Sequence, residues 1–221
     1  MKRIVAVLVM VAMLFSITSV AFAAGSFVES PSKKRAPIVI DFKTGSGCTG
    51  RLVITGYADR ATLPTPVREA LETAYTQIKN SKDVSALCAA LAGVASNKNI
   101  KTTSLAVSEL FDISVEGCTE HENHHNFDIT IAPESLVGFV GLMHFRNGAW
   151  ELVTDAKVEN NGEHLTFSVE TLSPFAIVVN TEELVNPNPT GDTLTYVLMA
   201  VAVLAAAGLV VVAISSKRKQ I

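Results

Sequence analysis

The sequence predicts a mainly β fold with a helical insert, and three observations support this prediction. Short runs rich in β-branched and aromatic residues alternate with turn residues, as in antiparallel β-sandwiches. Between residues 64 and 96 the apolar residues repeat instead with the period of a helix. Each end of the 221-residue chain contains a long apolar stretch without charges. We therefore expect an antiparallel β-sandwich-like body with a two-helix hairpin, flanked by an N-terminal signal helix and a C-terminal transmembrane helix.

Residues 1–23 have the composition of a secretory signal peptide. Lys2 and Arg3 precede an apolar run, and small residues follow it up to Ala23. This order predicts cleavage by signal peptidase between Ala23 and Ala24. The alternative, a membrane-spanning helix, would need about 20 apolar residues, and hydroxyl side chains interrupt the run before that length.

Residues 24–37 are rich in serine, proline and basic residues without periodicity, which predicts a flexible leader. The folded body then spans residues 38–180. It opens with β-rich runs at 38–42 and 51–55 on either side of a glycine-bearing loop, and this combination predicts a β-hairpin.

A helical insert at about 64–96 is expected to lie on the sheet. In its first helix Thr65 is the expected N-cap and Pro66 the first helical residue, and an apolar stripe follows at helical spacing. After a polar break, a second helix from about 83 to 96 repeats this stripe and carries Cys88 on it.

Beyond residue 99 the pattern returns to short strands separated by turns such as Asn147-Gly148. Strands of this length and spacing predict an antiparallel arrangement, with the helical insert between the early and the late strands. The expected ranges are 105–115, 127–131, 138–145, 149–153, 157–159, 165–169 and 176–179.

The C-terminal residues predict a tether and a membrane span. Residues 181–193 form the linker, and the prolines within 186–192 are expected to keep that stretch extended. Residues 194–214 are uncharged and long enough to cross a hydrocarbon core, and the basic tail 215–221 belongs on the cytoplasmic side. We expect a single-pass protein of the cell membrane or cell wall, with an extracellular body and a cytoplasmic C-terminus.

Thr190 and Gly191 follow prolines in this linker, just before the hydrophobic span and the basic tail. The order resembles the cell-wall sorting signal of Gram-positive surface proteins, in a degenerate form with Asn188 where the family has proline. The resemblance implies that a sortase cleaves between Thr190 and Gly191 and joins the threonine carboxyl to peptidoglycan. The alternative is a retained membrane helix, which the hydropathy supports regardless of the motif.

A second resemblance rests on the strand 141–145, the run 147–152, and residues 165–167 leading to 172–179. These segments are similar to the C-terminal portion of small cell-surface β-domains of Firmicute-type bacteria. The resemblance implies a β-sandwich on a surface protein and no particular ligand.

The exported body is acidic. All 21 Asp and Glu lie between the two apolar ends, whereas five of the 18 Lys and Arg lie outside them. The body therefore carries a net charge of −8, the remaining 13 basic residues against 21 acidic ones. This charge argues against nucleic acid or an anionic lipid surface as a partner.

Residues 118–125 bring Cys118, His121, His124 and His125 into one short tract. Thiolate and imidazole are ligands that zinc and copper prefer, so the tract is a candidate metal site. Its spacing matches no closed tetrahedral motif, and such polar residues also suit a solvated loop. Adjacent His124 and His125 point opposite ways from an extended strand, so at most one of them joins His121.

Three cysteines leave one thiol unpaired in an exported chain. Cys88 is expected to be a buried free thiol because it lies on an apolar helix stripe. Cys48 and Cys118 both fall in inter-strand loops. They would form a disulfide if those loops share one end of the body.

The chain has no nucleophile elbow, zinc-protease helix or phosphate-binding loop motif. Scattered carboxylates such as Asp59, Asp112 and Asp155 are expected on the surface, and Trp150 in the core. We therefore expect a non-enzymatic, envelope-anchored protein for adhesion, structure or binding, without catalytic residues or a cofactor. The alternatives are an extracellular metal-binding protein that uses residues 118–125 and an envelope hydrolase with titratable residues in a pocket. The sequence does not specify the ligand.

Overall fold

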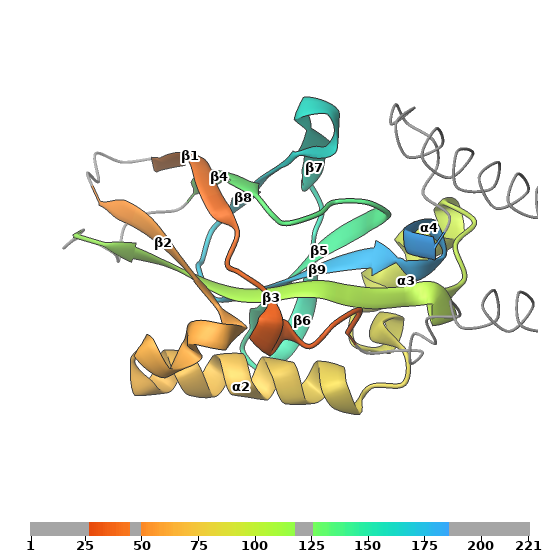
Figure 1. Cartoon of the computed structure of the whole chain (residues 1–221), viewed down its shortest axis with the longest axis horizontal. Coiled ribbons are helices and arrows are strands. Elements are labelled where there is room, and N and C mark those ends of the chain that lie inside the picture. The colour runs from red at the N-terminus through yellow and green to blue at the C-terminus, as the bar shows by residue number, and fades with distance from the viewer. Residues whose placement is uncertain (1–26, 45–49, 118–125, 186–221) are drawn as a thin grey trace, which may run out of the picture. The chain divides into compact units, whose positions relative to one another are not determined.

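The computed structural model describes residues 27–44, 50–117 and 126–185 (Figure 1). Their fold is mainly antiparallel β, with the strands in two sheets and with few helices. The chain divides into Met1–Leu184 and Val185–Ile221, and both sheets belong to the first unit.

Within the described residues, the two sheets contain four and five strands, and every neighbouring pair is antiparallel. The strands predicted from the sequence are confirmed with ends that differ by at most two residues. The smaller sheet has the order β1 (Ile38–Thr44), β4 (Phe127–Ala132), β8 (His164–Val169) and β7 (Lys157–Glu159). The larger sheet has the order β2 (Arg51–Gly56), β3 (Leu105–Glu116), β9 (Pro174–Asn180), β5 (Phe139–Arg146) and β6 (Ala149–Val153).

The hairpin predicted from the first two strands is wrong. β1 pairs with β4 in the smaller sheet, whereas β2 pairs with β3 in the larger one. Val39 and Phe42 of β1 and Leu52 of β2 all contact the same apolar core between the sheets. In one sheet these side chains would cover this core from a single side. The connection instead carries the chain from one sheet to the other, so that the core is covered from both sides.

The core between the sheets depends on the alternation of side chains along β9, whose residues are all buried. Phe175 and Ile177 point toward the smaller sheet, where they join Ile129 and Ile131 of β4 and Phe167 of β8. A strand that is buried on both faces also needs a cover on its other side.

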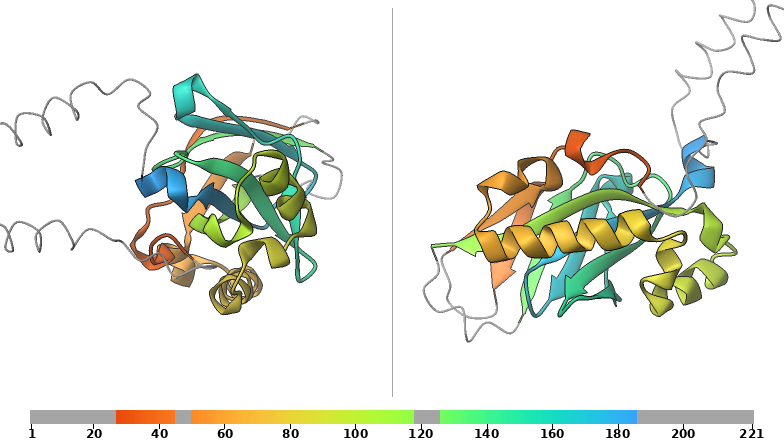
Figure 2. Two further views of the ribbon diagram at one scale, coloured as in Figure 1. Left: turned by 90° about the vertical axis from the view of Figure 1, so that its right-hand side faces the viewer. Right: turned by 90° about the horizontal axis from the view of Figure 1, so that it is seen from below.

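Helices provide that cover. Figure 2 shows α2 (Thr65–Asn80) and α3 (Ala89–Asn97) on one side of the strands. Leu71 of α2 and Leu91 of α3 pack with Val178 of β9 in a second apolar core, so the predicted helical insert does lie on the sheet. A short helix, α4 (Thr181–Val185), follows β9 directly. Short 3-10 turns lie at Pro31–Lys33, Tyr57–Thr62, Val84–Ala86, Thr102–Ser104 and Asn160–Gly162.

The helix starts differ from the prediction. The N-cap of α2 is Pro64, so Thr65 is already helical, because the proline preceding it holds an extended backbone. The second helix begins at Ala89, since Asp83 accepts a hydrogen bond from the backbone N–H of Ser85 and closes a separate 3-10 turn first. Cys88 is buried with a free thiol, as predicted.

The leader makes contacts before residue 38, where the sequence predicts that order begins. The N–H of Val28 donates to the carbonyl of Val107 in β3 at 2.9 Å. Further along, the Lys34 ammonium lies 3.0 Å from the Glu134 carboxylate. Residues 27–37 therefore run along the folded body, because Phe27 and Val28 add apolar contacts to its cores.

β3 extends along the whole domain (Figure 1). Its first residue, Leu105, pairs with Asn180, which leads directly into α4. Its last residue, Glu116, pairs with Arg51. Twelve residues of strand separate these two ends by about 36 Å. The chain thus continues toward its C-terminal part from one end of β3, while the connection to β4 starts at the other.

Candidate functional site

Most of the predicted site residues lie outside the described residues. This holds for the signal cleavage site at Ala23 and Ala24, the sorting motif at Thr190 and Gly191, and the predicted span 194–214. It also holds for the candidate metal ligands Cys118, His121, His124 and His125, and for Cys48. Within the described ranges, no group of three or more His, Cys, Asp and Glu side chains could hold a metal ion. No helix in these ranges has both the length and the hydropathy of a membrane span.

The strands that lead to Cys48 and Cys118 are neighbours. Arg51, where β2 begins, pairs with Glu116, where β3 ends, and their side chains form an ion pair of 2.8 Å. Antiparallel partners have Cα atoms about 5 Å apart. The two connections that contain these cysteines therefore start from adjacent positions at one end of the larger sheet.

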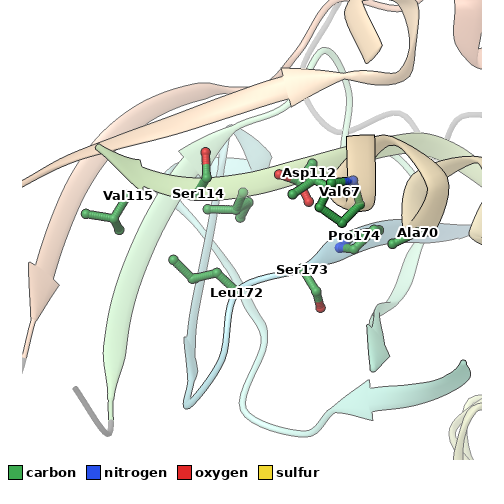
Figure 3. A pocket seen from close by; sticks show the side chains of 10 residues that line it. Val67, Ala70, Asp112, Ser114, Val115, Leu172, Ser173 and Pro174 are labelled. Atoms are coloured by element: carbon green, nitrogen blue, oxygen red, sulfur yellow. The ribbon is translucent and has the colours of Figure 1, made fainter. Parts of the chain in front are cut away.

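A groove lies in the half of β3 that is remote from α4. It has a volume of about 450 Å³ and lies between the first turns of α2 and the ends of β3 and β9 (Figure 3). Its walls are mostly apolar. They are formed by Pro66, Val67 and Ala70 of α2, by residues 112–115 of β3 and by residues 172–174 at the start of β9.

Among the described residues that line this groove, Asp112 is the one ionisable side chain. It is only 2% exposed, so the prediction of a surface charge is wrong here, although Asp59 and Asp155 are exposed. The register of β3 places Asp112 opposite Pro174 of β9, on the face of the sheet that α2 covers. Asp112 from β3 and Val67 from α2 both border the groove (Figure 3).

The Asp112 carboxyl has no hydrogen-bond or ion-pair partner among the described residues. Pro66 and Pro174, which line the groove with it, have no backbone N–H to donate. Burial without compensation raises the pKa of Asp112 to about 7, because the charged form loses its hydration. Near neutral pH this carboxyl group can therefore donate or accept a proton.

Ser173, the residue just before β9, contacts a buried histidine. Its Oγ lies within hydrogen-bond distance of His144 Nε2 and donates to the carbonyl of Phe145 at 2.7 Å. Because the hydroxyl proton goes to that carbonyl, Oγ accepts from the imidazole, which is the reverse of nucleophile activation. Burial also lowers the pKa of His144 to about 4, and its ring stacks on Phe175. The pair ties the segment before β9 to β5.

A second buried carboxyl group on β3 is structural. Glu109 is 2% exposed and accepts a hydrogen bond of 2.9 Å from the N–H of Glu134, in the β4–β5 connection. Burial raises the pKa of Glu109 to about 7 despite this bond and the nearby Lys34. Glu109 thus fastens the β4–β5 connection to β3, away from the described residues that line the groove.

Sequence reasoning missed the groove, but a signal for it was present. Asp112 interrupts a strand whose neighbours Leu110, Phe111 and Ile113 are all apolar. A carboxylate inside such a run is either exposed on an edge strand or buried in a central one. The structure shows that β3 is a central strand, because it pairs with β2 on one side and β9 on the other.

Fold and groove together define a mainly antiparallel β domain of two sheets, with helices on the free face of the larger sheet and a buried carboxyl group at one end. Comparison with known proteins finds no protein-family model, no curated protein and no solved structure that matches the chain.

Proposed function

We propose that the chain is an exported, envelope-anchored, non-enzymatic surface protein whose β-sandwich-like body is a binding or adhesion module. The signal-like residues 1–23 and the apolar stretch 194–214 with its basic tail support export and anchoring. The net charge of the body supports a protein or another uncharged or cationic ligand rather than nucleic acid or an anionic membrane surface.

The binding role is supported mainly by the positions of α4 and the groove at opposite ends of β3. The chain leaves the domain through α4, next to the first residue of β3. The groove around Asp112 lies toward the last residue of the same strand. The groove is therefore separated along β3 from the residues through which the chain leaves the sheet. This arrangement suits a surface module that binds a ligand away from its attachment point.

The anchoring role can be tested by removing residues 194–221 in a Gram-positive host. No other stretch of the mature sequence is long and apolar enough to span a membrane, so the truncated protein is expected in the medium and the full chain in the envelope fraction. A truncated protein that stays with the membranes, or a full chain that stays in the cytoplasm, would contradict the proposal.

The mode of anchoring needs a separate experiment, because a sortase link and a retained helix both keep the protein at the envelope. Mass spectrometry of the mature C-terminus distinguishes them. A chain that ends at Thr190 with a peptidoglycan fragment indicates a sortase, and a chain that ends at Ile221 indicates a retained span. Thr190→Ala is the matched control, since it should abolish the first product and leave the second unchanged.

A further inference from the structure

Without a binding partner, the buried carboxyl group of Asp112 destabilises the fold. An unpaired carboxyl group that is 2% exposed loses its hydration without receiving a hydrogen bond in return. The residue is nevertheless part of the lining of an open groove and is not enclosed in the apolar core. A partner that enters the groove could supply the missing hydrogen bonds.

We infer that the groove beside Asp112 binds a lysine side chain of a partner polypeptide, with the ammonium group against the carboxylate and the aliphatic stem along the apolar walls. This inference rests on the proposed binding function and adds the chemistry of the ligand.

Charge complementarity favours a cation. The described lining residues include one ionisable group, which is acidic, and no described cation pairs with it, including Arg68 in the first turn of α2. The body around it carries an excess of acidic residues, which attracts a cationic partner over a distance. An anionic ligand would be repelled by the same negative charge.

The shape of the groove favours a lysine over a compact cation. Val67, Ala70 and Pro174 present apolar surface that a chain of methylene groups can cover. A volume of about 450 Å³ lies within the range of small-ligand sites and exceeds the need of an ammonium ion alone. It has room for the stem and for part of the peptide that carries it.

The test measures binding of blocked tripeptides to the mature full-length protein in detergent micelles by calorimetry. The peptides have the sequence Ala-X-Ala, with lysine, norleucine or glutamate at the central position. The lysine peptide is expected to bind about 30-fold or more tightly than the norleucine peptide, because only its ammonium group pairs with the buried carboxylate. The glutamate peptide should show no binding. Equal affinity for lysine and norleucine, or tighter binding of glutamate, would overturn the inference.

Two variants locate the site. Asp112→Asn keeps the shape of the side chain and should weaken lysine-peptide binding by about 30-fold, whereas Glu151→Gln removes one exposed charge on β6 and should leave it unchanged. Ala70→Leu keeps the carboxylate but fills the groove, and it should also abolish binding. Unchanged binding in either groove variant, once its melting curve shows a folded protein, would contradict the site. Free n-pentylamine tests whether the groove binds any alkylammonium ion or a lysine within a polypeptide. If n-pentylamine binds as tightly as the lysine peptide, the inference of a polypeptide partner is wrong.

The experiments distinguish an error in the lysine-binding inference from an error in the proposed function. A protein that reaches the envelope but does not bind the lysine peptide refutes the ligand and leaves the anchored module in place. A protein that binds the peptide but is retained in the cytoplasm supports the groove and refutes the export.

Discussion

The guanidinium group of Arg51 lies 2.8 Å from the carboxylate of Glu116, where β2 begins and β3 ends. Cys48 lies three residues before the first of these residues, and Cys118 two residues after the second. We therefore predict a disulfide between Cys48 and Cys118 under oxidising conditions, with Cys88 reduced. Peptide mapping without reduction should find this bond and a free thiol at Cys88.

The disulfide should also stabilise the fold. It would close a loop of roughly 70 residues, for which chain entropy gives about 4 kcal/mol. Cys48→Ser is expected to lower the free energy of unfolding toward that of the reduced parent. Equal stability of the oxidised parent and the variant would contradict the bond.

The pH dependence of stability should change when Asp112 is replaced by asparagine. The pKa of this carboxyl group is raised from 3.8 to about 7 on folding. Between these values the folded protein holds a proton that the unfolded chain has lost, so the contribution of Asp112 to stability falls as the pH rises through this window. The whole loss, complete above pH 7, is about 4 kcal/mol.

Asp112→Asn removes this ionisation and keeps the size of the side chain. We expect the variant and the parent to have similar free energies of unfolding near pH 4, and the variant to be more stable by roughly 2–4 kcal/mol at pH 8. Urea denaturation at several pH values measures the difference. Glu151→Gln is the control, and a difference for Asp112→Asn that stays constant with pH would show that the carboxyl group is not desolvated.

Among the described glycines, Gly138 is predicted to be the one whose replacement by alanine destabilises the fold most. Its φ is +70°, and a Cβ added there would lie 2.7 Å from the carbonyl oxygen of Asn180. At Gly148 the φ is +81°, but no atom lies within 4 Å of an added Cβ. Gly148→Ala should therefore cost about 1–2 kcal/mol, for the left-handed backbone alone. Gly138→Ala should cost about 3 kcal/mol or more, since the β5 and β9 ends must separate. Similar losses in the two variants would mean that this contact can relax.

The two apolar cores are predicted to unfold together, because β9 supplies residues to both. Leu71→Ala in the helix-side core and Leu165→Ala in the core between the sheets should each cost about 2–5 kcal/mol. Trp150, the single tryptophan, lies in the helix-side core and reports on it by fluorescence. Leu165→Ala should therefore shift the fluorescence transition and the circular dichroism transition equally. A fluorescence transition that does not respond, or a stable proteolytic fragment of residues 64–96, would show separate units.

Local sequence patterns predict most of the secondary structure of the described residues. The alternation of apolar residues places β3, β4 and β6 almost to the residue, because each strand has one or both faces in an apolar core. The stripe at helical spacing predicts α2 for the same reason. Trp150 in the core and the buried free thiol of Cys88 follow from their apolar neighbours.

Strand pairing and the burial of Asp112 were decided only in the tertiary structure. β1 and β2 are adjacent in sequence, but each gains more by pairing in a different sheet, where both cover a shared core. Asp112 is buried because β2 and β9 flank its strand and α2 covers its face. These neighbours are up to about 60 residues away in sequence, so no local pattern encodes them. The sequence by itself therefore determines which segments are strands and helices, because that choice depends on neighbouring side chains. The site depends on contacts that exist only once the sheets and helices have packed.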